Sequence, residues 1–229
     1  GTFLSNTKEI TYEEFMIEDI PAEWVFVNKA HRKDKVILYC HGGGYCTGSS
    51  KYARTLTSKL AMGTLMEVLS FDYRLAPENP YPAAGEDAMK VWNYLMLQGY
   101  GASDVILAGD SAGGNLALTL TLQLKNENRM LPGGLVLFSP WTDMTFSGTS
   151  FEKRAPKDPV LTTEYMYEIR KAYAPQGEFD SPGLSPLFGD MKGFPPTYIQ
   201  VGENEILLSD ATRLYRKLQE EQVKVFLDK

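Results

Sequence analysis

Residues 105–113 read VILAGDSAG, and this stretch decides the fold of the chain. Its first four residues are apolar and two of them are β-branched, a pattern typical of a strand buried on both faces. A helical pattern, Leu116–Leu124, follows directly. Residues 109–113, directly after the apolar run, match G-x-S-x-G, in which a serine lies on a tight turn between strand and helix. Small neighbours are needed in that turn because larger side chains would clash, so the stretch predicts a nucleophile at Ser111.

Short apolar runs and longer helical patterns alternate in both directions from this stretch. Strands are expected at Trp24–Val27, Val36–Cys40, Leu65–Phe71, Val105–Ala108, Leu135–Ser139, Tyr198–Val201 and Val223–Leu227. Helices are expected at Tyr52–Ala61, Ala83–Leu97, Ala112–Lys125, Thr163–Ala172 and Ser209–Glu221. This alternation predicts an α/β fold, a mostly parallel twisted sheet with helices on both faces and its chemistry at the carboxyl ends of the strands.

One segment, from Trp141 to Pro196, contains no convincing strand. Roughly fifty residues is too long for a plain connection between elements. We expect a partial cap inserted into a single domain that spans residues 1–229, because aromatic side chains in the segment could cover a site. A surface excursion without a covering role is the alternative.

Composition excludes several classes of protein. The 229 residues carry 23 Lys and Arg against 29 Asp and Glu, a net charge of −6, which disfavours a nucleic-acid binder. No apolar run reaches the roughly 18–20 residues of a membrane span. The stretch Gly1–Ser5 lacks the features of a secretory signal, so a cytoplasmic location is expected.

A second glycine-rich motif, His41-Gly42-Gly43-Gly44, follows the expected strand Val36–Cys40. Consecutive glycines leave backbone N–H groups unshielded, and such groups can donate to the oxyanion that forms when a serine attacks a carbonyl. The N–H of Ala112, directly after the serine, would complete this oxyanion hole. We expect His41 and Asp110 to orient the surrounding loops rather than to act as base.

With these motifs the chain resembles the hormone-sensitive-lipase group of α/β hydrolases, the bacterial family IV esterases. The matching segments are His41–Gly44, Asp72–Glu78, Gly109–Asn115 and Val201–Glu205. The resemblance implies the α/β-hydrolase fold and hydrolysis of small-molecule esters with short to medium acyl chains, through an acyl-serine intermediate and without metal or organic cofactor. By position it assigns Ser111 as nucleophile and Gly43, Gly44 and Ala112 as oxyanion donors. It also allows a homodimer built on the edge strand Val223–Leu227.

The acid of a catalytic triad should follow a late strand, where its carboxylate can orient an imidazole. The loop after Tyr198–Val201 offers Glu203, Glu205 and Asp210. Similar enzymes carry Asp or Glu three residues after the glycine that ends this strand, which favours Glu205. Asp210, at the start of a helix, is the alternative.

The base is missing from the residues after the serine. The chain holds two histidines, His31 and His41, and both precede Ser111, whereas α/β hydrolases have the order Ser, acid, His. In related esterases the histidine follows the acid by roughly thirty residues, so it is expected beyond Lys229, and the chain is expected to be truncated at both ends. His31 is expected to be a solvated residue of a polar hairpin turn. The alternative function is a catalytically inactive small-molecule-binding homologue, as in plant gibberellin receptors.

Overall fold

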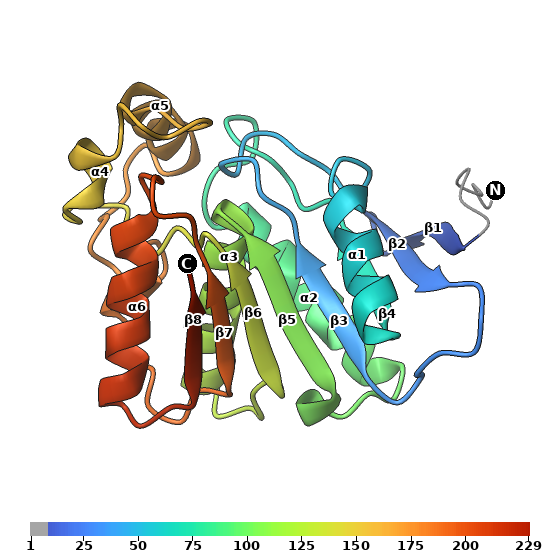
Figure 1. The fold of residues 1–229 in the computed structure, drawn as a ribbon. Coiled ribbons are helices and arrows are strands. Elements are labelled where there is room, and N and C mark those ends of the chain that lie inside the picture. The colour runs from blue at the N-terminus through green and yellow to red at the C-terminus, as the bar shows by residue number, and fades with distance from the viewer. Residues whose placement is uncertain (1–8) are drawn as a thin grey trace.

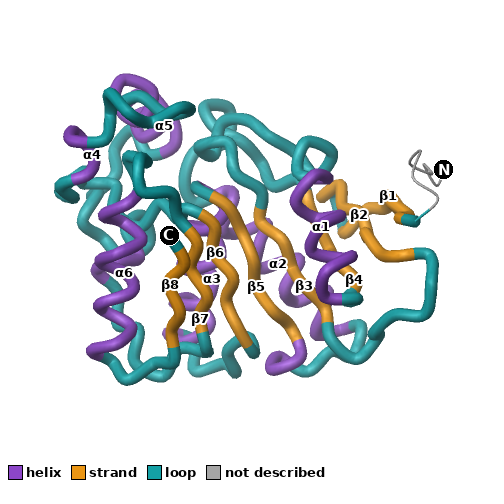
Figure 2. The backbone as a smooth tube through the Cα atoms, viewed as in Figure 1, coloured by secondary structure: helices purple, strands orange, loops and turns teal. Residues whose placement is uncertain are grey.

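The computed structural model describes residues 9–229, and the stretch Gly1–Ser5 lies outside the described residues. An eight-stranded sheet with helices on both faces dominates the structure (Figure 1; Figure 2). The strands are β1 (Ile10–Ile17), β2 (Ile20–Val27), β3 (Val36–Cys40), β4 (Glu67–Phe71), β5 (Val105–Asp110), β6 (Gly134–Phe138), β7 (Thr197–Gln200) and β8 (Val225–Asp228). The helices are α1 (Arg54–Thr64), α2 (Ala83–Leu97), α3 (Ala112–Asn126), α4 (Ser150–Lys153), α5 (Thr163–Tyr173) and α6 (Leu208–Glu220), with short 3₁₀ turns η1 (Ala102–Asp104) and η2 (Pro186–Phe188).

The strand order is β1-β2-β4-β3-β5-β6-β7-β8. β1, β2 and β4 pair in antiparallel fashion, and the strands from β4 to β8 are parallel. This confirms the predicted mostly parallel sheet. Because parallel strands end at the same edge, the loops after β3, β5, β6 and β7 meet there, which is where ligands bind in open α/β sheets.

Alternate side chains of each central strand enter different halves of the core. Leu38 and Leu107 pack with α2 and α3, while Ile37 and Tyr39 pack against α1. Figure 1 shows α1 in front of the sheet and α2 and α3 behind it. Burial on both faces explains why these strands are continuously apolar in sequence.

Two expectations at the amino-terminal side were incomplete. The expected strands omit β1, because its alternation of buried and exposed residues breaks at the exposed pair Glu13–Glu14. Leu65 was expected in a strand but ends α1, with a left-handed φ of 58° and an amide that donates to the carbonyl of Ala61. Propensity alone does not separate this cap residue from the strand that follows it.

The expectation for His31 was wrong. Residues 29–34 do not form a hairpin turn, because β4 lies between β2 and β3 in the sheet. The His31 imidazole is hydrogen-bonded to Glu67 at 2.7 Å and stacks on Phe26 with ring centroids 5.6 Å apart. Hydrogen bonds to Glu67 and to the backbone of Lys29 raise the pKa of His31 above its ordinary value.

Candidate active site

Ser111 lies on a tight turn between β5, which ends at Asp110, and α3, which begins at Ala112. Its φ of 53° lies in the left-handed region that non-glycine residues rarely adopt. The Ser111 amide donates to the carbonyl of Phe138 at 2.9 Å, and the Trp141 amide donates to the carbonyl of Ser111 at 3.0 Å. The strand–turn–helix context of G-x-S-x-G is therefore present, with its strained backbone held by bonds to the neighbouring strand's end.

The glycines on either side of Ser111 allow α3 to approach the sheet closely. A Cβ on Gly113 would overlap the carbonyl oxygen of Cys40, at the end of β3. A Cβ on Gly109 would overlap the backbone of Gly113. The need for small residues inferred from the motif is thus a matter of backbone contact.

The loop after β3 has an unusual backbone conformation at three successive residues. The φ angles of Gly43, Gly44 and Tyr45 are 119°, 64° and 62°. Glycine adopts such values without steric cost, whereas Tyr45 needs support from its surroundings. That support comes from burial: Tyr45 is 1% exposed, its hydroxyl donates to Asn115 Oδ1 at 2.6 Å, and its ring stacks on Tyr173.

Asp110 connects this loop to the serine turn. Its Oδ1 accepts a hydrogen bond from the Gly42 amide at 2.9 Å and another from the Tyr39 hydroxyl at 2.6 Å. The residue before the serine therefore holds the glycine loop beside the serine. The loop-orienting role of Asp110 stays a prediction, for which these two hydrogen bonds give a structural basis.

His41 is enclosed beneath the same loop. It is 2% exposed, its Nδ1 donates to the carbonyl of Gly42 at 2.6 Å, and its ring stacks on Tyr73 at 4.2 Å. Burial lowers the pKa of His41 below its ordinary value, so the ring is neutral at pH 7. The Tyr73 hydroxyl donates to the His41 carbonyl at 2.6 Å. The orienting role of His41 likewise stays a prediction.

A cavity of about 470 Å³ brings most of the predicted site residues together. Gly43, Gly44, Asp110, Ser111 and Glu205 line it, although they follow three different strands. Apolar side chains from α5 and from the loop before it form much of the remaining wall. Among the described residues that line the cavity there is no Lys, Arg or His. The cavity therefore has an apolar wall and carboxylates near the serine.

The two candidate acids have different surroundings. Glu205 lies in the loop after β7, lines the cavity, and its Oε2 accepts from the Gly202 amide at 2.6 Å. Asp210 is buried in α6, where one carboxylate oxygen accepts from the amides of Thr142 and Asp143 at 2.9 and 3.0 Å. Burial raises the pKa of Asp210 to about 7. Asp210 thus fixes the start of the segment 141–196, and the geometry favours Glu205 as the carboxylate near Ser111.

Two of the residues that line the cavity without being predicted as site residues are Ile169 and Asp158. Ile169 belongs to the buried face of α5, and its apolar character marked it only as core. Asp158 fixes the loop that precedes α5: its carboxylate accepts from the amides of Val160, Leu161 and Ile206 at 2.7–2.8 Å. The Asp158-Pro159 dipeptide was the available signal, since Asp before Pro favours a turn.

Neither histidine reaches the cavity of Ser111. His41 lies behind the glycine loop, and His31 pairs with Glu67 at the start of β4.

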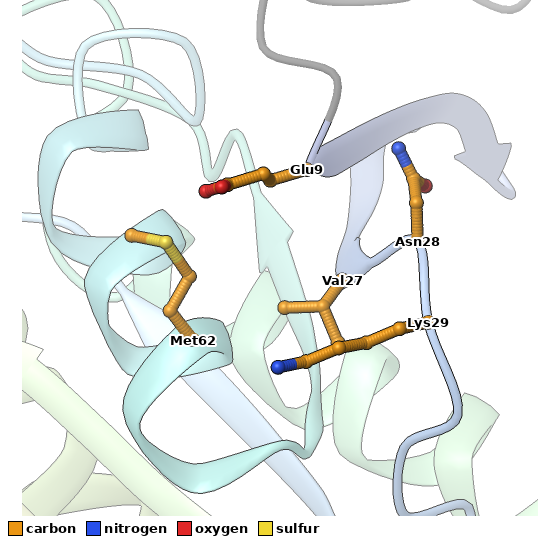
Figure 3. A pocket seen from close by; sticks show the side chains of 5 residues that line it. All are labelled: Glu9, Val27, Asn28, Lys29 and Met62. Atoms are coloured by element: carbon orange, nitrogen blue, oxygen red, sulfur yellow. The ribbon is translucent and has the colours of Figure 1, made fainter.

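A separate cavity of about 310 Å³ lies beside α1 and the ends of the first two strands. Figure 3 shows its lining residues, Glu9, Val27, Asn28, Lys29 and Met62. It contains none of the predicted site residues.

The chain is similar to known hydrolases over most of its length. The model of a family described as having the alpha/beta hydrolase fold matches residues 37–229. An esterase of Acinetobacter venetianus is 41% identical over 192 residues, which are 83% of this chain and 63% of that protein. An acetyl-hydrolase of Streptomyces hygroscopicus is 38% identical over 193 residues, 84% of this chain and 64% of that protein.

The fold likeness extends over nearly the whole chain. The crystal structure of an esterase from the bacterial hormone-sensitive lipase family matches with a TM-score of 0.93 and 38% identity, covering 99% of this chain and 75% of that one. The chain therefore belongs to the α/β-hydrolase family, in its hormone-sensitive-lipase-like group. It spans less than two thirds of the length of the two curated relatives. Within residues 9–229, none of the helices has the length and apolar character needed to cross a bilayer.

Proposed function

We propose that the protein is a serine carboxylester hydrolase that acts on esters with short to medium acyl chains. One observation carries the proposal: Ser111, on its strained turn, lines the same cavity as Gly43, Gly44 and Glu205. A nucleophile, backbone donors and a carboxylate are the parts that acyl transfer through serine requires. The relatives described above, an esterase and an acetyl-hydrolase, support the same reaction class.

In the proposed reaction the Ser111 Oγ attacks the ester carbonyl. The N–H groups of Gly43, Gly44 and Ala112 stabilise the tetrahedral oxyanion. Losing one of these donors should raise the activation barrier by on the order of 2.7–4 kcal/mol. The alcohol leaves, and water hydrolyses the acyl-Ser111 ester in a second step. Asp110 and His41 act through the loops that they hold.

The reaction also needs an imidazole that takes the Ser111 proton and passes it to the alcohol. Since neither histidine among the 229 residues reaches the cavity, we propose that this base comes from outside them. Glu205 would orient it, because one carboxylate oxygen is held by Gly202 while the side chain lines the cavity.

The segment 141–196 supplies much of the apolar wall of the cavity, and we propose that it acts as a partial cap over a single domain. Homodimerisation through β8 also stays a proposal. β8 is an edge strand of the sheet, and Phe226 on it is 63% exposed. Size-exclusion chromatography of the wild type and of Phe226→Glu tests the dimer. A cytoplasmic location stays a prediction that fractionation of the source cells can check.

The proposal is tested with the protein as encoded in its complete gene and p-nitrophenyl butyrate as substrate. Ser111→Ala should abolish turnover, while Ser58→Ala, at a half-buried position of α1 that does not line the cavity, should not change it. Glu205→Gln should lower kcat by about 10³-fold or more, because the imidazole would lose its orienting charge. Turnover that survives Ser111→Ala would refute the assignment. Ester binding without turnover in the wild type would favour the receptor-like alternative.

A further inference from the structure

Two side chains of α5, Ile169 and Tyr165, lie against Gly44 of the glycine loop. A Cβ built on Gly44 would lie 2.7 Å from Cδ1 and 3.0 Å from Cγ2 of Ile169. Ile169 therefore packs directly against the backbone of the residue proposed as an oxyanion donor. It also lines the cavity that contains Ser111.

Ile169 is fixed in this position. It is 5% exposed and belongs to the main hydrophobic core, together with its neighbour Met166. The hydroxyl of Tyr165, one turn earlier on α5, lies against the same loop, 3.1 Å from a Cβ built on Gly44. A side chain held on both sides in this way cannot move aside at low cost, because protein cores are close-packed.

The strand order decides which part of an ester meets Ile169. Gly44 follows β3, Ser111 follows β5 and Glu205 follows β7, and β3 and β7 lie on opposite sides of β5. A base oriented by Glu205 must protonate the leaving alcohol, so the alcohol part lies toward β7. The acyl chain then extends on the side of β3, past Gly44.

We propose that Ile169 forms the end wall of the acyl site and limits the length of the acyl chain that the protein accepts. This inference rests on the proposed esterase function and adds a specificity determinant to it. The cavity wall beside Ile169 is apolar, with Met166 and Leu161 in the lining, so the chain accepted there is an uncharged aliphatic one. Esters whose acyl chain carries a carboxylate are excluded, since the charged groups near the serine are themselves carboxylates.

The experiment compares kcat/KM for p-nitrophenyl acetate, butyrate, hexanoate and octanoate in the full-length wild type and three variants. Ile169→Ala should raise the octanoate-to-butyrate ratio by about tenfold or more, since a methylene in an apolar pocket changes discrimination by at least about that factor. Ile169→Val removes only Cδ1, the nearer of the two methyl carbons to Gly44, and should give a smaller rise than Ile169→Ala. Ile169→Phe should shift the preference to acetate.

Two controls separate this role from a structural one. Leu218→Ala deletes a buried aliphatic side chain in the last turn of α6 and should leave the length profile unchanged, even if it lowers stability. A series of acetate esters with longer alcohols should respond equally in the wild type and the Ile169 variants. Length ratios within about twofold of the wild type in both Ile169→Val and Ile169→Ala, or a change confined to the alcohol series, would overturn the proposal.

A binding measurement keeps the inference testable if the wild type hydrolyses none of the esters, a result that would refute the proposed function alone. In a Ser111→Ala background, the dissociation constants of methyl octanoate and methyl butanoate are measured by calorimetry. Adding Ile169→Ala should strengthen octanoate binding relative to butanoate by about tenfold. An unchanged ratio would overturn the role of Ile169 without any reference to turnover.

Discussion

The substitution Gly113→Ala should damage the fold through one methyl group. A Cβ on Gly113 would lie 1.9 Å from the carbonyl oxygen of Cys40, whereas real Cβ atoms keep at least 3.0 Å from such an atom. α3 and β3 would have to separate by about 1.1 Å at this point. Both elements are buried in the centre of the molecule, so no flexible side chain can absorb the displacement.

Overpacking of a core by a single group costs about 1–3 kcal/mol and occasionally more. Because the clash is between backbone atoms, we expect a loss at or above the upper end of that range. The free energy of unfolding is measured by urea denaturation followed by far-UV circular dichroism. This readout does not depend on the proposed activity.

Gly63→Ala in α1 is the matched control, because a Cβ there meets no atom within 4 Å. Alanine in a helix is favoured over glycine, so this variant should be more stable than the wild type by about 0.4–1 kcal/mol. Opposite signs for the same chemical change would establish the contact as the cause. If the free energy of unfolding of Gly113→Ala lies within about 0.5 kcal/mol of the wild-type value, the steric reasoning is wrong.

Three further substitutions test the buried polar groups. Burial raises the pKa of Asp210 to about 7, so the folded state binds the proton more tightly than the unfolded one. The free energy of unfolding should then contain a contribution that decreases as the pH rises from about 4 to about 7. Asp210→Asn should remove this contribution, as measured by urea titrations at stepped pH. Arg54→Met should lower the free energy of unfolding by about 3–5 kcal/mol, because it leaves Glu23, which is 0% exposed, without its 2.8 Å ion-pair partner. Lys51→Met, at the surface, is the control and should change it by less than about 1 kcal/mol in the same assay. Asn115→Leu should lower the thermal unfolding midpoint, because it leaves three buried hydrogen-bonding groups without a partner, at about 1–3 kcal/mol each.

The sequence predicted the central part of the fold well, because the physical signals there are local. The bounds expected for the strand Val36–Cys40 and the helix Ala83–Leu97 are those observed. Continuous apolar runs mark strands buried on both faces, and glycine clusters mark the turns that only glycine accommodates. The residues of the candidate site were predicted from the same signals, since they lie at strand ends or in the loops that follow them.

The parts that the sequence did not predict depend on contacts between distant residues. The burial of His31 depends on its contact with Glu67, 36 residues later in the sequence, and no local pattern predicts that contact. The contact of Ile169 with Gly44 depends on where the long segment returns over the sheet. Spacing along a helix shows that Ile169 is buried, but not which surface it is buried against.

Asn115, which is 0% exposed, links the glycine loop to the segment 141–196. Its Oδ1 accepts from the Tyr45 hydroxyl, while its Nδ2 donates to the carbonyls of Trp141 and Leu184 at 2.8 and 2.9 Å. An aspartate could not replace it, because a carboxylate has no proton to donate to two carbonyls. The amide therefore ties the glycine loop to two points of this segment. It follows that a substitution at Asn115 should alter how the loop presents its N–H groups, and so affect kcat.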